Sequence, residues 1–441
     1  MSAPDPAGAA RGRPSRAPFR ERASWALYDF ANTIFSMNIV TLYFAVWLVT
    51  ERGASNTAYS VATSLSSVAV LFAAPWVGAV SDATGRRKPW VVGLTVACVA
   101  ATLALSPAAR LTGSAGILVL LALFAVANTA YQLAMPPYNA MLPDLAPPEE
   151  RGRLSGVGTA VGYAGSIAGV LLVAPFVNGG LGIRAGGRAA SFVPTALLFL
   201  LFSLPLFLFC RDRRLVPRGE RRRPRLSALF AELADAFRAA RKHPGLLRFV
   251  ASSYFYQDAL GTAISFMALY AVAVLGLPAG GEIRLFVVLT IPAMIGAWIV
   301  GRACDRFGPR RALVAVLVGW IVGLVVIASA PSLSGFWVGG VIVGLSFGGI
   351  WAAERPLMLR LSPADESGRF FGLLALSARA AAIVGPLLWA AIVDGIGPSI
   401  GRNASYRLAV LSLSVMMAVA LVLLLGVPRW VDEAPESATT R

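Results

Sequence analysis

The sequence predicts an all-α integral membrane protein whose twelve transmembrane helices form two six-helix bundles related by pseudo-symmetry. Hydrophobic residues make up 57% of the 441 residues and charged residues only 14%, whereas a soluble chain carries about a quarter charged residues. Apolar runs of roughly 20 residues recur along the chain, and each can cross a hydrocarbon core of ~30 Å. The predicted spans lie near 25–49, 58–80, 89–108, 115–140, 153–177, 190–210, 249–275, 283–302, 312–330, 335–359, 369–393 and 405–427.

A short signature occurs once in each half, between two apolar runs. Gly78–Lys88 and Gly301–Arg311 both fit G-x-x-x-D-x-x-G-x-R-[KR], at an offset of 223 residues. A duplicated turn inside a duplicated membrane domain is typical of transporters whose halves rock against each other. The carboxylates can pair with basic residues and hold one arrangement of the halves, although both loops also serve as topology anchors. The candidate latch residues are Gly78, Asp82, Gly85, Arg86, Arg87, Asp305, Gly308 and Arg310.

The distribution of positive charge predicts the orientation in the membrane. With both termini placed in the cytosol, 30 of the 39 Lys and Arg residues fall in inner segments and 7 in outer loops. This asymmetry follows the positive-inside rule. The net charge of +17 therefore indicates a multi-pass protein of the cell inner (plasma) membrane in contact with membrane lipids, and it does not indicate a nucleic-acid partner.

The chain divides into two bundles joined by a basic linker. The linker contains an apolar stripe at helical spacing, which predicts an amphipathic helix that tethers the halves or, less simply, binds a regulatory partner. The two halves are parallel repeats, because each contains six spans. The predicted segments are a disordered cytosolic tail (1–24), an N-terminal bundle (25–210), the cytosolic linker (211–248), a C-terminal bundle (249–427) and a cytosolic tail (428–441).

Polar residues follow one face of the first, fourth, seventh and tenth spans. In the first, Asp29, Asn32 and Ser36 lie at i, i+3 and i+7. Ionisable groups are costly in hydrocarbon and face a cavity or a partner. We expect a central cavity lined by these four spans, with hydrogen bonds between helices as the alternative for any single residue. The candidate substrate and coupling residues are Tyr28, Asp29, Asn32, Asn128, Gln132, Tyr138, Asn139, Tyr254, Gln257, Asp258, Glu354, Arg355 and Arg379.

The fifth span carries a row of small residues. Gly158, Gly162, Gly165 and Gly169 lie at i, i+4, i+7 and i+11. Such a face allows close packing of helices. A surface on which helices slide during a conformational change is the second interpretation.

The twelve spans, the repeat and the loop signature resemble the major facilitator superfamily over residues 24–430. Four stretches resemble its vacuole-effluxer-like branch (autophagy-related effluxer / unknown major facilitator): Trp25–Asn32, Tyr138–Leu145, Tyr256–Asp258 and Phe370–Leu373. The resemblance implies alternating access, in which the two halves rock about a site near the membrane midplane. Fungal members of that branch are implicated in exporting amino acids from the vacuole.

Two departures from that branch bear on the substrate. It commonly has Ser-Arg-Ser in the tenth span, where this chain has Glu354-Arg355-Pro356. A Lys is usual in the eleventh span, where Arg379 stands. Because arginine keeps its charge in proteins, a titrating role of that lysine does not carry over to this chain.

These observations predict a secondary active transporter that exports a small polar solute, such as an amino acid, in exchange for protons. Arg379 would attract a carboxylate, while Asp29, Asp258 or Glu354 would bind an ammonium group or carry the proton. Alternatively, the two aspartates only gate the cytosolic side, with Arg153, Arg369 or Arg379 as partners. Each bundle pair encloses its own cavity, so we expect a monomer.

Two further functions stay open. Efflux of lipophilic or cationic compounds would use Trp351, Phe347 and Met135 as stacking surfaces and Glu354 as the cation site. A non-transporting sensor or scaffold would require an appended soluble domain. An enzyme is not expected, because no nucleophile and base can be assembled around His243, the only histidine. No metal spacing and no cofactor motif is present, and the expected coupling ion is H⁺.

Overall fold

The computed structural model describes residues 16–54, 56–213, 229–275, 281–363, 366–381 and 384–432. In this part of the chain the secondary structure is helical apart from one isolated β-bridge between Gly180 and Ile183. Nine helices within it are long and apolar enough to cross a membrane. The prediction of an all-helical membrane protein is therefore confirmed.

The N-terminal half contains the first six predicted spans. Its first span begins as α1 and continues through wider π-helical turns, so that it forms one long helical segment. The bounds are α1 (Phe19–Phe35), η2 (Ser36–Tyr43), α2 (Phe44–Val46), η3 (Trp47–Glu51), α3 (Asn56–Thr84), α4 (Lys88–Ala108), α5 (Gly113–Leu133), α6 (Met135–Ala140), α7 (Leu142–Leu145), η4 (Pro148–Glu150), α8 (Arg151–Asn178), η5 (Arg188–Ser191) and α9 (Phe192–Phe209).

The C-terminal half repeats this arrangement after the linker helix α10. Its eleventh span is divided into shorter helical pieces, whereas the tenth is a single helix. The bounds are α10 (Leu229–Lys242), α11 (Leu246–Leu275), α12 (Gly281–Phe307), α13 (Pro309–Ser329), α14 (Leu333–Leu361), α15 (Ser367–Ala380), α16 (Val384–Ala390), η8 (Ala391–Ile396), α17 (Gly397–Ile400), α18 (Arg402–Leu425) and η9 (Arg429–Asp432).

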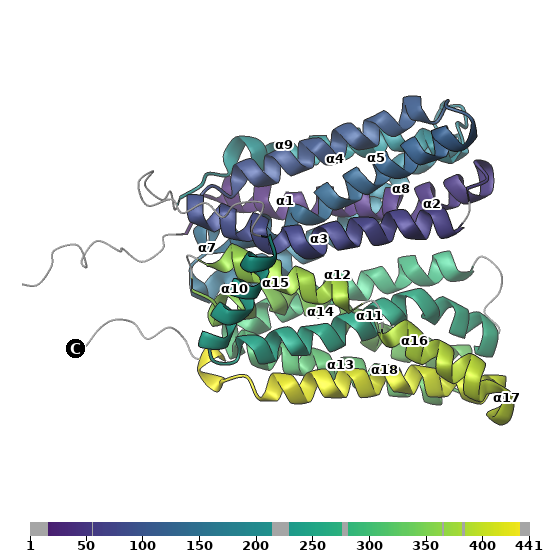
Figure 1. Ribbon diagram of the computed structural model, residues 1–441. Helices are drawn as coiled ribbons and strands as arrows, with labels where there is room; N and C mark the ends of the chain where they lie inside the picture. The colour runs from purple at the N-terminus through teal and green to yellow at the C-terminus, as the bar shows by residue number, and fades with distance from the viewer. Residues whose placement is uncertain are drawn as a thin grey trace, which may run out of the picture.

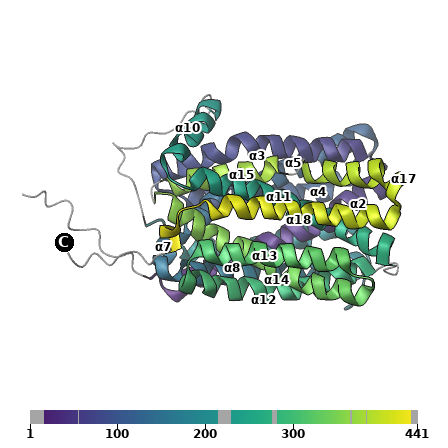
Figure 2. The same cartoon turned by 90° about the horizontal axis from the view of Figure 1, so that it is seen from below.

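The two halves lie side by side with their helices running along a common direction (Figure 1). The helices of the second half are seen in front in the view from below (Figure 2). The halves meet mainly where α8 packs against α12 and α14, and where α3 packs against α15. We call the end at which α1 begins and α18 ends the terminal end; both signature loops lie there. The linker helix α10 packs against α3 and α15 near this end.

The first bundle begins earlier than the predicted boundary. α1 begins at Phe19, inside the segment 1–24 that we expected to be a tail. The part of the linker from 214 to 228, which includes most of its basic run, lies outside the described residues, as do 1–15 and 433–441. Within the described linker, Leu229–Lys242 forms the expected helix.

The turns of the two signatures depend on glycine. Gly85 and Gly308 have φ values of +62° and +91°, a conformation that a residue with a side chain adopts only with strain. These glycines let α3 and α12 reverse directly into α4 and α13. The carboxylate of each signature, Asp82 or Asp305, therefore lies in the last turn of its helix.

Large apolar side chains occupy both the interior and the outer surface. Trp25, Trp320 and Phe124 are fully buried, while Leu171, Leu208 and Val422 are each more than 60% exposed. An exposed apolar surface of this kind is suited to contact with lipid chains and not with water.

Glycine rows allow the closest helix contacts. A Cβ added to Gly165 of α8 would overlap the Phe30 carbonyl of α1, and one added to Gly348 of α14 would overlap the Ala293 carbonyl of α12. The glycine face of the fifth span therefore packs against α1 of its own half. This contact accounts for the small residues by packing, and it leaves sliding as a separate hypothesis.

We predict that Gly348→Ala destabilises the protein by about 1–3 kcal/mol, because the added methyl group must push α12 and α14 apart. The apparent Tm of the purified protein in detergent measures this effect. Gly261→Ala is the matched control, since nothing lies within 4 Å of the position of its Cβ and alanine favours the helix. An unchanged Tm for Gly348→Ala would contradict the close packing of α12 on α14.

Candidate functional site

A cavity of about 720 Å³ lies between the two halves. Its volume is in the range of sites that bind small molecules. In the N-terminal half it is lined mainly by α1, the α5–α6 segment and α8, and in the C-terminal half mainly by α11, α12, α14 and α15. Most of its wall is apolar or aromatic, and its ionisable residues are Asp29 of α1 and Glu354 and Arg355 of α14.

A buried ion pair joins the halves at this cavity. The guanidinium group of Arg355 on α14 donates from Nη1 to Asp29 Oδ2 at 2.8 Å and from Nη2 to Asp29 Oδ1 at 3.0 Å. The Arg355 side chain is 9% exposed and that of Asp29 is 6% exposed. This bidentate geometry is the strongest form of a carboxylate–arginine contact. The tenth span is thereby bound to the first span of the other half.

Two aromatic rings of the N-terminal half also hold Arg355. Its guanidinium carbon lies 5.4 Å from the ring centroid of Trp25 and 5.6 Å from that of Tyr138, within the range of cation–π attraction. The rings are stacked 4.8 Å apart. Trp25 Nε1 donates to the Tyr138 carbonyl, and the Tyr138 hydroxyl donates to the Trp25 carbonyl. The two rings that contact Arg355 are therefore held in place by each other.

Glu354 is the second carboxylate at the cavity wall, and its hydrogen-bond partners are neutral. Its Oε2 accepts from the Tyr256 hydroxyl at 2.6 Å and from Gln257 Nε2 at 3.1 Å. Both donors belong to α11 of the same half. No described arginine or lysine forms an ion pair with Glu354. Because Asp29 and Arg355 are paired with each other, Glu354 is the carboxylate of the described cavity wall that has no cationic partner.

An aromatic cluster borders the same wall. The Phe347 and Trp351 rings of α14 are 5.0 Å apart and perpendicular. Tyr163 of α8 lies 5.9 Å from Phe347 and 6.3 Å from Trp351. Trp320 of α13 lies 6.2 Å from Phe347. These rings come from both halves and offer faces to an apolar or cationic solute.

The structure brings part of the predicted residue set to the cavity and leaves part elsewhere. Asp258 is 1% exposed and accepts from the Gly385 backbone N–H at 2.9 Å instead of facing the cavity. Tyr28 bonds Thr95, and Asn128 donates to Ser66. The backbone of Arg379 lies in α15, but its side chain lies outside the described part. The predicted residues at the wall are Asp29, Asn32, Gln132, Asn139, Gln257, Glu354 and Arg355.

Asp258, Tyr28 and Asn128 thus bond to structural partners and do not line the cavity. Tyr138 lies behind Arg355, and Tyr254 is not among the residues that line the wall. The ion-pair partner of Asp29 is Arg355, which was not among the gating partners expected for it, Arg153, Arg369 or Arg379. Sequence analysis did not select Tyr163 or Tyr256. Tyr163 follows Gly162 on the fifth span, and an aromatic residue beside a glycine row is a signal that could have identified it.

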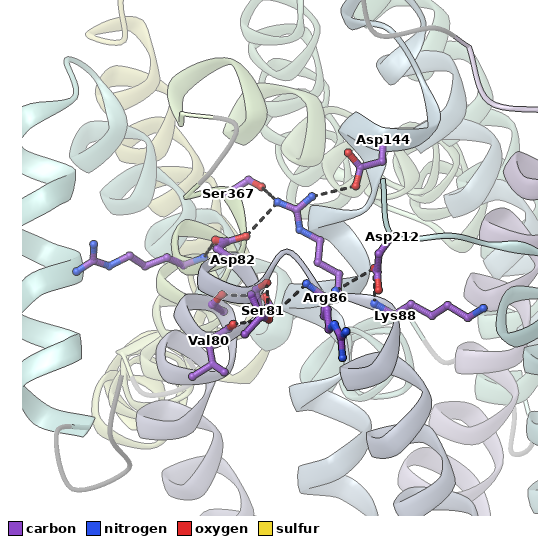
Figure 3. Close-up of polar contacts among 12 residues, drawn as sticks. Val80, Ser81, Asp82, Arg86, Lys88, Asp144, Asp212 and Ser367 are labelled. Atoms are coloured by element: carbon purple, nitrogen blue, oxygen red, sulfur yellow. Dashed lines mark hydrogen bonds and ion pairs between the residues drawn. The ribbon is translucent and has the colours of Figure 1, made fainter. Parts of the chain in front are cut away.

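The first signature loop binds the start of α15 in the other half (Figure 3). Asp82 Oδ2 accepts from the Arg369 backbone N–H at 2.9 Å. Arg87 forms ion pairs with Asp82 at 3.0 Å and with Asp144 at 3.2 Å, and it also donates to the Ser367 hydroxyl. A carboxylate at a helix N-terminus is stabilised by the free N–H groups and the helix dipole.

The second signature loop makes the corresponding contact in the opposite direction. Asp305 accepts from the backbone N–H groups of Gly152 and Arg153, each at 2.7 Å, at the start of α8. Arg310 does not join this contact, because it donates to the Leu425 carbonyl of its own half.

Glycines let the first signature loop approach α15 closely, since a Cβ on Gly78 would overlap the Gly368 carbonyl. Arg86 is exposed, and its backbone N–H donates to Thr84.

A second pair of carboxylates repeats between the halves and was not predicted. Asp212 accepts from the N–H groups of Arg87 and Lys88 at the start of α4. Asp432 accepts from those of Arg310 and Arg311 at the start of α13. Burial raises the pKa of both aspartates above its ordinary value, while these backbone N–H bonds act in the opposite direction. Each half therefore has an aspartate after its last span that caps the helix following its signature.

We predict that the stability effects of changing Asp29 and Arg355 are strongly coupled. Asp29→Asn and Arg355→Gln each leave a buried charge without its partner, at a cost of about 3–5 kcal/mol. The double variant removes both charges and should be less destabilised than the sum of the singles. Apparent Tm values of the four proteins test this. Additive effects would show that the pair does not hold the halves together.

Comparison with known proteins supports the family resemblance. The chain matches the model of the Major Facilitator Superfamily over residues 29–302 and 285–441. It is 26% identical over 426 residues to the uncharacterized MFS-type transporter YxiO of Bacillus subtilis, covering 93% of this chain and 95% of that protein. It is 24% identical to the multidrug resistance protein MdtG of Klebsiella pneumoniae, covering 84% of each.

Solved structures share the fold at low sequence identity. The human organic anion transporter MFSD10 superposes with a TM-score of 0.72 at 14% identity, covering 92% of this chain and 100% of that chain. A bacterial homologue of the iron transporter ferroportin, in its outward-facing state, gives 0.69 at 16% identity, covering 92% and 98%. With the family model matched over most of its length, this chain belongs to the Major Facilitator Superfamily and is a membrane transporter.

Proposed function

We propose that this protein is a secondary active transporter that exports lipophilic cations in exchange for protons. The observation that carries the proposal is Glu354, a carboxylate at the cavity wall whose hydrogen-bond partners, Tyr256 and Gln257, are neutral. A cation bound there gains a countercharge and aromatic faces at the same time. The similarity to proteins named multidrug resistance protein MdtG supports the same substrate class.

The proposed mechanism is alternating access. In the described conformation both signature aspartates hold the halves together at the terminal end. We infer from the positive-inside pattern that this end is cytosolic and that the protein is a monomer in the inner (plasma) membrane. The described state is then closed to the cytosol. Opening on that side requires Asp82 and Asp305 to release the helix starts of the opposite half.

A small polar solute such as an amino acid is the second candidate, as in the vacuole-effluxer-like branch that the sequence resembles. It is favoured by the presence of opposite charges in one cavity, since Arg355 could receive a carboxylate and Glu354 an ammonium group. In the described state, however, Arg355 is already bound by Asp29 and two rings. A zwitterion would have to displace Asp29, whereas a cation meets Glu354 directly. A sensor or scaffold has no need of such a cavity.

We predict that Glu354→Gln lowers the uptake of tetraphenylphosphonium into proteoliposomes at least about tenfold, because the cation loses its countercharge while the side-chain size is kept. Uptake is driven by a pH gradient with the membrane potential clamped. Asp258→Asn is the matched control, since that carboxylate does not line the cavity, and it should keep most of the activity.

Two results would contradict the proposal. Uptake that is unchanged without the pH gradient would exclude exchange with protons. Uptake that is blocked by neutral zwitterionic amino acids, with Glu354→Gln still active, would favour the polar-solute candidate.

We also predict that Asp82→Asn impairs transport more than Asp305→Asn. Asp82 binds both a cation, Arg87, and a backbone N–H, so the neutral amide loses an ion pair. The bonded partners of Asp305 are the N–H groups of Gly152 and Arg153, one on each carboxylate oxygen. Asparagine keeps one of these bonds through its amide oxygen and loses no ion pair. Initial transport rates of the two variants at equal protein density test this. Equal rates would indicate that both loops serve only as topology anchors.

A further inference from the structure

A stripe of exposed residues runs along the outer face of α12. Ile291, Ile295 and Trp298 are each between 45% and 47% exposed, and Arg302 and Arg306 continue the same face. Their spacings of three and four residues keep them on one side of the helix. Toward the terminal end the stripe changes from aliphatic to aromatic to basic. This is the order of a membrane from hydrocarbon core to headgroups.

Arg302 adopts a distinctive position within this stripe. Its guanidinium carbon lies 3.6 Å from the ring centroid of Trp298, so the side chain turns back along the helix. The guanidinium of Arg306 lies 5.2 Å from the ring of Phe307. Among the described residues neither arginine has an ion pair or a hydrogen bond to a carboxylate. Stacking leaves the N–H donors of the guanidinium available to an oxygen anion.

The nearest acidic residue in sequence is occupied elsewhere. Asp305 lies between the two arginines, but its two oxygens accept the N–H groups of Gly152 and Arg153. The other faces of α12 are packed against α8, α13 and α14. The arginines therefore face outward without a protein countercharge in the described part of the chain.

The repeat shows that the fold does not require this stripe. At the offset of 223 residues that relates the two signatures, Trp298, Arg302 and Arg306 correspond to Pro75, Ala79 and Ala83. The N-terminal helix α3 instead has the linker helix α10 packed against it. The corresponding stripe on α12 is exposed, so its aromatic and basic residues are a feature of the second half alone.

We propose that this stripe is a binding site for one anionic phospholipid. The phosphate receives the N–H donors of Arg302 and Arg306, and the acyl chains lie along Ile291 and Ile295. Trp298 lies at the boundary between them and orients Arg302. Charge complementarity selects an anionic headgroup, because two arginines without a carboxylate give no site for the choline or ethanolamine cation of a zwitterionic lipid. The site is separate from the cavity and does not rest on the proposed substrate.

The double variant Arg302→Ala/Arg306→Ala tests the proposal, because it introduces the residues that stand at the equivalent positions of α3. We expect it to retain phosphatidylglycerol at least about tenfold less than the unaltered protein when lipid-bound states are counted by native mass spectrometry. Retention of phosphatidylcholine should be equal in both. Arg311→Ala is the matched control, since it removes an exposed arginine at the same end.

A second readout uses Trp298 itself. Brominated phosphatidylglycerol should quench the fluorescence that Trp298→Phe removes, and brominated phosphatidylcholine should quench it less. If the double alanine variant does not fold, Arg302→Gln/Arg306→Gln replaces it. Equal retention of both lipids, or loss of bound phosphatidylglycerol on adding inorganic phosphate alone, would overturn the proposal, the latter by showing a simple anion site.

Discussion

The buried pair of Arg355 and Asp29 is the constraint on which the rest of the cavity depends. A guanidinium inside a membrane bundle must have a countercharge, because the cost of leaving it unpaired exceeds that of any single packing contact. Its countercharge comes from the other half, so the pair fixes how α14 lies against α1. Both carboxylate oxygens of Asp29 are bonded in this pair. Glu354, the residue before Arg355, is then the carboxylate at the cavity wall that has no cationic partner in the described part of the chain.

The two signature aspartates stand at equivalent positions of the sequence repeat, and each binds the opposite half. Asp82 caps α15 and Asp305 caps α8, so each half closes on a helix start of the other. Backbone N–H groups are the partners in both cases, and such contacts survive changes in the side chains of the capped helices. The copies differ because Arg87 pairs with Asp82 and also donates to Ser367 of the other half, whereas Arg310 donates to the Leu425 carbonyl of its own half.

Sequence periodicity predicted the spans, the repeat and the family, because hydrophobicity and glycine turns are local properties. It placed Asp29 and Glu354 on inward faces, but it could not show which residue of another helix each one meets. Asp258 shared the polar face of its helix, yet its carboxylate accepts the Gly385 N–H near the start of α16, a contact between helices that spacing does not encode. The caps formed by Asp212 and Asp432 depend on contacts between loops, which spacing does not encode.

The positions of these contacts connect the proposed solute site to the interface between the halves. The Asp29–Arg355 pair and both interlocking caps join the halves, so opening at the terminal end must break them in one movement. Separation of the pair would leave Arg355 against Trp25 and Tyr138, so that the cation keeps two aromatic contacts. A solute cation at Glu354 acts on the neighbouring residue of the same helix. The ion pair between the halves and the proposed cation site therefore share one turn of α14, through Arg355 and Glu354.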